Sequence, residues 1–187
     1  MRYFIGFLIF ILLIVMLVAL IFRGGDEPKV PSTAKTLDSY ASTDAQVIMT
    51  TDGPLNADAN HEQIRITVDR DNATFEYIKG YQGKVVKMQH YPNNEPAYTN
   101  FLAALGRAGF TQGDNSPALR DERGYCPSAS RFIYELKQGT RNIQRYWASD
   151  CGKPKSYLGS VTVTNDLFQD QIPDYDTLLE SLNVQTL

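Results

Sequence analysis

The chain begins with a long apolar segment and continues with alternating polar and apolar positions. Twenty consecutive residues without a charge occupy positions 3–22, and a polar sequence starting at Arg23 follows. At 1.5 Å rise per residue, a helix of this length crosses the roughly 30 Å hydrocarbon core of a bilayer. A cleaved signal peptide has a shorter apolar core that ends in small residues, whereas this run ends in Ile21 and Phe22. The pattern predicts an uncleaved transmembrane signal anchor over residues 1–23, with the lipid bilayer as the partner of residues 3–22.

Beyond residue 45 the apolar positions take the spacing of β-strands. Ile64, Ile66 and Val68 alternate with polar residues, as on a strand with one buried face. The same pattern predicts strands over residues 46–51, 62–69, 73–79, 84–91, 131–137 and 140–148. In the fourth of these strands we expect three side chains to point inward, namely those of Val86, Met88 and His90.

Helical spacing appears after the fourth strand. Tyr98, Phe101, Leu102 and Leu105 form one apolar stripe, and Asn94 stands where an N-cap residue is expected. Further helices are predicted over residues 161–171 and from residue 174 onward, with a proline between them. The chain is therefore expected to contain two or three helices after the membrane segment.

The order of these elements predicts the fold class and the domains. We expect an α+β fold in which an antiparallel sheet of meander and hairpin strands packs against two or three helices, preceded by one transmembrane helix. Residues 24–45 are rich in Gly, Pro, Ser and Thr and lack apolar periodicity, so they are expected to form a flexible juxtamembrane linker. Residues 46–187 are then a single extracytoplasmic domain.

The two cysteines, Cys126 and Cys151, flank the predicted hairpin. A two-residue turn at Gln138 and Gly139 pairs residues whose numbers sum to 277, as those of the two cysteines do. The cysteines would then lie opposite each other, close to the spacing that a disulfide needs. Two free buried thiols are the alternative. A disulfide forms in oxidising compartments, so it places the N-terminus in the cytoplasm and the domain outside, which the charges flanking the apolar run do not decide alone.

Composition and motifs argue against several classes of function. The formal net charge is −3 and the sequence pI is near 5.4, with no basic patch, so no nucleic-acid partner is expected. His61 and His90 are far apart in the sequence, and no P-loop, G-x-S-x-G or H-E-x-x-H motif occurs. We therefore expect no catalytic residue, no metal site and no cofactor.

Two polar segments are candidates for partner binding, because arginine and aromatic side chains often anchor interfaces. The first is the loop before the hairpin, with Arg120, Asp121, Glu122, Arg123 and Tyr125. The second is on the last predicted strand, with Arg141 and Arg145. The alternative is that these charges are simply solvated.

The last third of the chain resembles short membrane-anchored envelope proteins of small-genome bacteria from candidate phyla. The resemblance rests on Cys126-Pro127, residues 131–136, residues 144–147, Cys151 and residues 167–175. These proteins carry no assigned activity, so the resemblance implies an envelope location only.

A second resemblance concerns the order of the elements, which is similar to that of emfourin-type protease inhibitors. It rests on residues 51–53 (Thr-Asp-Gly), residues 64–69, the helix end at residues 105–110 and residues 131–136. These are core and turn positions, so the resemblance implies a protease partner but no inhibitory residue.

Together these observations predict a single-pass membrane protein with its C-terminal domain outside the cytoplasm. The leading hypothesis is a non-enzymatic binding or structural module of the cell envelope, with another envelope protein as a partner. The alternatives are a surface-anchored protease inhibitor and a hydrolase whose site is assembled from distant residues.

Overall fold

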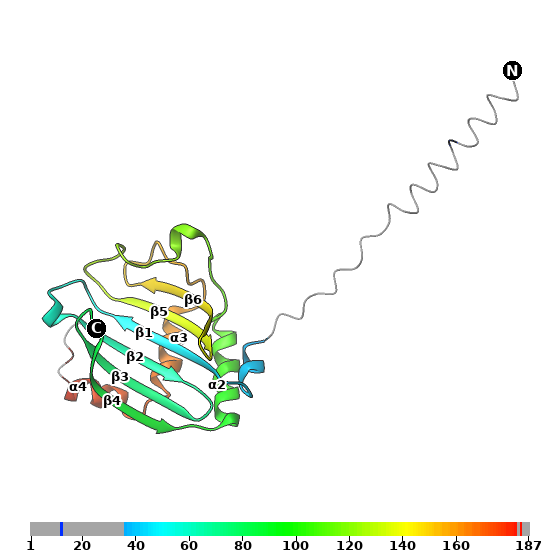
Figure 1. The fold of residues 1–187 in the computed structure, drawn as a ribbon, viewed down its shortest axis with the longest axis horizontal. Coiled ribbons are helices and arrows are strands. Elements are labelled where there is room, and N and C mark those ends of the chain that lie inside the picture. The colour runs from blue at the N-terminus through cyan, green and yellow to red at the C-terminus, as the bar shows by residue number, and fades with distance from the viewer. Residues whose placement is uncertain (1–11, 13–35, 183, 185–187) are drawn as a thin grey trace, which may run out of the picture. The chain divides into compact units, whose positions relative to one another are not determined.

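The computed structural model describes residue 12, residues 36–182 and residue 184 of the 187-residue chain (Figure 1). The anchor predicted over residues 1–23 lies outside these residues apart from Leu12, so it stays a prediction. Among the described residues, no helix combines the length and the apolar character that a membrane span requires. The chain divides into two units, residues 1–35 and residues 36–187, and the second contains all the elements described below.

A six-stranded antiparallel sheet forms the body of the second unit (Figure 1). The strands are β1 (Ala45–Asp52), β2 (Glu62–Val68), β3 (Asn72–Lys79), β4 (Lys84–Pro92), β5 (Arg131–Gln138) and β6 (Arg141–Ser149). Their order in the sheet is β4-β3-β2-β1-β5-β6. The first four strands make a meander, and the β5–β6 hairpin adds to the other side of β1. The predicted α+β class with an antiparallel sheet is confirmed.

The central strand β1 contributes to both faces of the sheet because its side chains alternate. Val47 and Met49 are fully buried in the main hydrophobic cluster. Met49 pairs with Ile66 on β2 and with Tyr134 on β5, both also buried. Thr50 and the other intervening residues belong to the opposite face.

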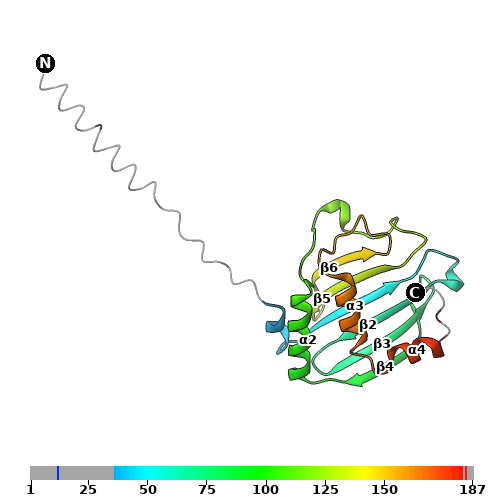
Figure 2. The same cartoon turned by 180° about the vertical axis from the view of Figure 1, so that it is seen from behind.

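Three α-helices cover one face of the sheet, as the two opposite views show (Figures 1 and 2). They are α2 (Glu95–Arg107), α3 (Val161–Gln169) and α4 (Tyr175–Ser181). The predicted cap of α2 is present: Asn94 accepts a hydrogen bond from the backbone N–H of Ala97 at 3.0 Å. Ser160 caps α3 in the same way through Val163 N–H.

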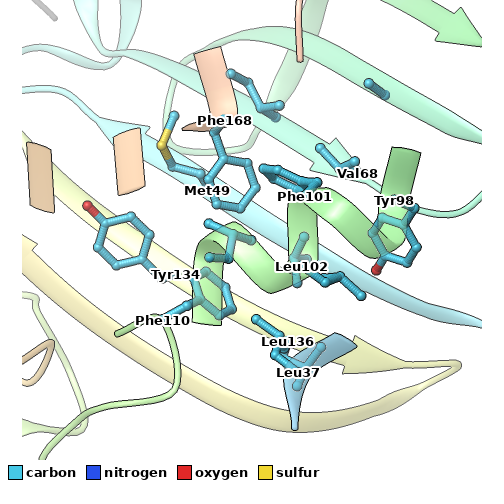
Figure 3. Packing of buried hydrophobic residues seen from close by; sticks show 14 of the residues in the cluster. Leu37, Met49, Val68, Tyr98, Phe101, Leu102, Phe110, Tyr134, Leu136 and Phe168 are labelled. Atoms are coloured by element: carbon cyan, nitrogen blue, oxygen red, sulfur yellow. The ribbon is translucent and has the colours of Figure 1, made fainter. Parts of the chain in front are cut away.

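Aromatic side chains fill the space between the helices and the sheet (Figure 3). Phe101 of α2 meets Phe168 of α3 edge to face, with ring centroids 5.3 Å apart. Phe110, just after α2, contacts both Phe168 and Tyr134. The predicted stripe of α2 is thus the face that packs on the sheet.

Three short 3-10 helices complete the unit: η1 (Leu37–Tyr40), η2 (Asp58–Asn60) and η3 (Pro117–Leu119). The first lies in the stretch that composition assigned to the linker over residues 24–45. Leu37 and Ala41 are buried members of the hydrophobic cluster. The folded part therefore includes residues before 45.

The inward orientation expected for Val86, Met88 and His90 is wrong, because all three side chains are exposed. The reason is a β-bulge between β3 and β4. Ile78 pairs with Val85, whereas the preceding residue of β3 pairs with position 87, so Val86 is an extra residue. One extra residue moves every later side chain to the other face.

The register expected for the β5–β6 hairpin is also wrong. Gln138 pairs with Arg141, so the turn consists of Gly139 and Thr140 instead of Gln138 and Gly139. A second irregularity follows Leu136, which shifts the remaining pairs by one further residue.

Candidate functional site

The sheet face away from the helices carries polar side chains in neighbouring rows at one end of the strands. Paired residues of neighbouring strands share a face, so Asp52 of β1 stands between Gln63 of β2 and Arg131 of β5. In the next row Thr50 stands between Arg65 and Ile133. Figure 1 views this uncovered face.

Asp52 is the centre of a buried ion pair. One Asp52 carboxylate oxygen lies 2.5 Å from Nη2 of Arg131, whose side chain is almost completely buried. The same guanidinium nitrogen donates a hydrogen bond to the Gly53 carbonyl at 3.1 Å. Nε2 of Gln63 donates to the other Asp52 oxygen at 2.7 Å. These contacts fix the positions of the side chains at this end of the face.

His61, the residue before β2, completes this network through a contact with Asp52. Its Nε2 lies 2.9 Å from Asp52 Oδ1, and its Nδ1 lies 3.3 Å from the Pro54 carbonyl oxygen. The imidazole is fully buried and stacks on Tyr81 with ring centroids 4.0 Å apart. Because both ring nitrogens are engaged and the ring has no solvent access, His61 holds the loop after β1 in place.

That loop forms the first wall of a cleft above the polar face. The Tyr81 hydroxyl donates to the Asn56 carbonyl at 3.0 Å and accepts from the Asn56 N–H at 3.1 Å. The Tyr81 N–H donates to Asp58 at 2.7 Å. The loop is therefore attached to the β3–β4 turn, and it presents the exposed side chain of Leu55 to the cleft.

The loop before β5 forms the second wall. Glu122 is buried and lies 2.8 Å from Nη1 and 2.8 Å from Nη2 of Arg145, although only the Nη2 contact has hydrogen-bond geometry. Burial lowers the pKa of the Arg145 guanidinium, but the contacts with Glu122 outweigh burial and the pKa is raised above its ordinary value. Arg145 is thus a fixed cation at the base of this wall.

Aromatic contacts hold the second wall on the sheet. The Trp147 indole N–H donates to the Leu119 carbonyl at 2.7 Å, and Tyr125 stacks on the Trp147 ring at 5.3 Å. At the tip, the Arg123 guanidinium beside Asp121 lowers the pKa of that carboxyl to about 2. The exposed rim of the wall therefore carries a salt bridge between Arg123 and Asp121.

The predicted disulfide is present and anchors the second wall. The Cys126 and Cys151 sulfur atoms are 2.01 Å apart, and the Cα atoms are 5.9 Å apart. Next to it, the Leu55 N–H donates to the Pro127 carbonyl at 2.7 Å. This hydrogen bond joins the two walls at one end of the cleft.

The resulting cleft has a volume of about 390 Å³. Its lining combines four arginines, three acidic residues and a few neutral side chains: Thr50, Asp52, Leu55, Gln63, Arg65, Tyr81, Glu122, Arg123, Arg131, Ile133, Glu135 and Arg145. In its floor, Nε of Arg131 is buried and has no hydrogen-bond partner among the described residues. A bound water or a ligand acceptor can satisfy such a donor.

The structure brings together some of the residues predicted for partner binding. Glu122, Arg123 and Arg145 line the cleft, and the Arg120 carbonyl accepts from Arg145 at 3.4 Å. Asp121 supports Arg123, and Tyr125 packs on the tryptophan beneath the wall. Arg141 lies apart, at the hairpin turn, where it donates to Gln138.

Sequence reasoning missed the sheet half of this cleft. The strand predicted over residues 46–51 ends just before Asp52, and Arg131 and Glu135 are polar positions of the strand predicted over residues 131–137. Alternation does indicate that these side chains share a face. It does not indicate that loops from both sides enclose that face.

The lining of the cleft indicates which kinds of ligand it can hold. In the described part of the chain, no three His, Cys, Asp or Glu side chains are placed to hold a metal ion. The cleft offers guanidinium donors, carboxylate acceptors and the apolar surfaces of Leu55, Ile133 and Tyr81. Such a lining suits a ligand that has both donors and acceptors, for example an extended peptide.

Comparisons with known proteins assign no family to the chain. No protein-family model matches the sequence, and a search of the curated proteins finds no match.

Proposed function

We propose that the protein is a membrane-anchored, extracytoplasmic binding module that holds its ligand in the cleft on the uncovered face of the sheet. The ligand class that fits is a polar chain with both charge signs, such as a segment of another envelope protein. The membrane part of this proposal rests on the sequence, and the binding part rests on the cleft.

The observation that carries the binding function is the preorganised cleft. Its volume of about 390 Å³ falls within the usual range for ligand sites. Its floor consists of strand residues, and Arg131 and Arg145 are held by buried carboxylates before any ligand arrives. Side chains fixed on strands lose little freedom on binding, which favours affinity.

The location of the domain follows from two features. The apolar run at residues 3–22 has the length of a membrane span. The bonded pair of Cys126 and Cys151 suits an oxidising compartment. These features support an anchor with its N-terminus in the cytoplasm and the domain outside.

Site-specific photocrosslinking in cells that express the full chain tests the binding proposal. A photoreactive amino acid replaces Leu55 in the cleft or Leu158 outside it; both leucines are exposed, at 46% and 56%. We expect a discrete covalent adduct from position 55 only. Equal adducts from both positions, or none from position 55, would contradict a cleft ligand.

Thiol labelling tests the location independently. Intact cells are treated with a reductant and then with a membrane-impermeant maleimide, and Cys126 and Cys151 are followed by mass spectrometry. We expect labelling of both residues in the membrane fraction only after reduction. A variant that lacks residues 3–22 should leave the membrane fraction. Labelling only after lysis would place the domain in the cytoplasm.

A further inference from the structure

The two edge strands of the sheet, β4 and β6, differ in the hydrogen bonding of their outer backbone groups. At the β6 edge, the backbone N–H groups of Ser156 and Tyr157 donate to the Trp147 carbonyl at 3.0 and 2.8 Å. The Ser156 hydroxyl accepts from the Trp147 N–H at 2.9 Å. At the β4 edge, no strand in the described part of the chain pairs with the outer side (Figure 1). The free edge is therefore β4.

Exposed apolar side chains concentrate along this free edge. Val85, Val86 and Met88 are 40%, 51% and 46% exposed, and the neighbouring Tyr81 is 50% exposed. Together they make up half of the large apolar residues that the described part of the chain exposes. A cluster of this kind marks an interaction surface more often than scattered single residues do.

Two lysines lie on the same strand without a partner. Within the described residues, neither Lys84 nor Lys87 takes part in an ion pair, and both are exposed. Their neighbour Lys79 differs, because its ammonium group lies 3.4 Å from Glu62. The β4 edge thus carries two uncompensated positive charges in a chain whose net charge is −3.

The register separates these two kinds of side chain onto the two faces. Val85 and Met88 pair with Ile78 and Glu76, which belong to the uncovered face. Lys84 and Lys87 pair with Lys79 and Tyr77, on the helix-covered face. The bulge at Val86 produces this division, because it keeps the two lysines on one face and the two apolar residues on the other.

We propose that β4 accepts an extended segment of a partner protein as a seventh strand, and that this segment alternates apolar and acidic residues. Backbone hydrogen bonds along the free edge provide the attachment, as in other strand-addition complexes. Apolar side chains of the segment meet Val85 and Met88, and carboxylates on its other face meet Lys84 and Lys87. Opposite charges directly across a strand pair are favourable.

A second copy of this chain fits the edge poorly. Pairing β4 with another β4 brings four ammonium groups, from Lys84 and Lys87 of each copy, onto two adjacent strands. Like charges on neighbouring strands are destabilising, and edge lysines and bulges are common protection against self-association. The same lysines attract an acidic segment.

Hydrogen exchange of the full chain in detergent micelles tests this proposal with three synthetic peptides. The first alternates Glu and Val over eight residues, the second alternates Lys and Val, and the third contains the Glu and Val residues in two blocks. We expect only the alternating acidic peptide, added up to millimolar concentration, to slow exchange of the β4 amides. Exchange in β6 should not change.

Charge reversal on the edge supplies the decisive comparison. The double variant K84E/K87E should bind the acidic peptide about tenfold more weakly and prefer the Lys–Val peptide, because two favourable cross-strand pairs become unfavourable. The control R107E/K153E changes the same number of exposed charges away from β4 and should bind as the unmodified chain does. Thermal unfolding verifies that each variant is folded.

Three results would overturn the proposal. They are no protection of β4 by the acidic peptide, equal protection by all three peptides, and protection that K84E/K87E leaves unchanged. Protection of the β4 amides that rises with protein concentration in the absence of peptide would assign the edge to a second copy instead. Loss of the cleft ligand in crosslinking would not affect these outcomes, since the four β4 residues that the proposal uses, Lys84, Val85, Lys87 and Met88, do not line the cleft.

Discussion

At the scale of single residues, charged side chains of the uncovered face are already paired with opposite charges of the same protein. Asp52 contacts Arg131, Gln63 and His61, and Arg131 has almost no solvent access. Removing water from such a pair is costly, so each partner needs the other. The network therefore holds the β1 end and the loop after it in one arrangement.

The first prediction concerns this pair. Asp52→Ala should lower the free energy of unfolding by about 3–5 kcal/mol, because it leaves the Arg131 guanidinium buried without its carboxylate. Denaturant unfolding of the purified chain measures the loss. Asp71→Ala removes an exposed carboxylate, 3.5 Å from Arg70, and should cost less than about 0.5 kcal/mol. Equal costs for the two variants would show that Arg131 finds another partner.

The second prediction concerns the rim of the cleft. Asp121 has its pKa lowered to about 2, mainly by hydrogen bonds from Arg123. Arg123→Ala should raise this pKa toward 3.8, the ordinary value of the group. Because the folded-state pKa is the lower one, the pair stabilises the loop fully above about pH 4 and loses that contribution as the pH falls through 2. A ¹³C NMR titration of the Asp121 carboxyl measures the shift, and Arg141→Ala should leave it unchanged.

At the scale of elements, local signals in the sequence account for the helices. Asn94 and Ser160 satisfy backbone N–H groups at the starts of α2 and α3, and Gly109 after α2 has a φ of +84°. These residues act within one turn, so their positions in the sequence are sufficient to predict them.

The third prediction tests the cap of α2. Asn94→Ala removes the hydrogen bond to Ala97 N–H and should cost about 1 kcal/mol of stability. Asn100→Ala, at an exposed position within the same helix, replaces a poor helix former by a good one and should not destabilise. Thermal or denaturant unfolding distinguishes the two. A destabilisation that is as large at position 100 would mean that the cap is not the cause.

The fourth prediction concerns the disulfide. Replacing Cys126 and Cys151 together by serine should lower stability by about 3 kcal/mol, because an unfolded chain without the cross-link gains conformational freedom. The amides of the loop before β5 should also exchange faster with solvent. Alkylation with and without prior reduction provides the check on the unmodified chain: identical masses in the two cases would mean that the thiols are free.

Sequence patterns were less reliable where the sheet departs from regular geometry. Alternation placed Val86 and His90 inward, and it would have been right without one extra residue in β4. The cysteine pair was predicted from a regular hairpin, although the observed turn is at Gly139 and Thr140. Both cysteines lie outside the paired strands, Cys126 before β5 and Cys151 after β6, so the bond does not require the expected register.

At the scale of the whole molecule, the two faces of the sheet have separate tasks. The helices bury one face, and most of the hydrophobic core consists of strand residues on that face. The other face stays open to loops, and the cleft forms there. Sequence alternation predicts which residues belong to each face, but the enclosure of the polar face depends on long-range contacts, such as Leu55 with Pro127 and Glu122 with Arg145, that no local pattern encodes.

The fifth prediction follows from the position of each strand. β1 is hydrogen-bonded on both sides and buried along its length, whereas β4 has a free edge and is largely exposed. Native-state hydrogen exchange should therefore be slowest in β1 and much faster in β4. Amides of β6 should be slower than those of β4, since Ser156 and Tyr157 cover that edge. Equal rates at the two edges would contradict this order.

The matched charges of the cleft also determine how quickly a ligand arrives. Each of the four cleft arginines, at positions 65, 123, 131 and 145, has a carboxylate partner. A cleft without excess charge exerts little long-range attraction on a charged molecule, so association occurs at the ordinary collision rate and depends weakly on ionic strength. Selection among ligands then takes place after contact, through the fit of the bound chain and its rate of departure.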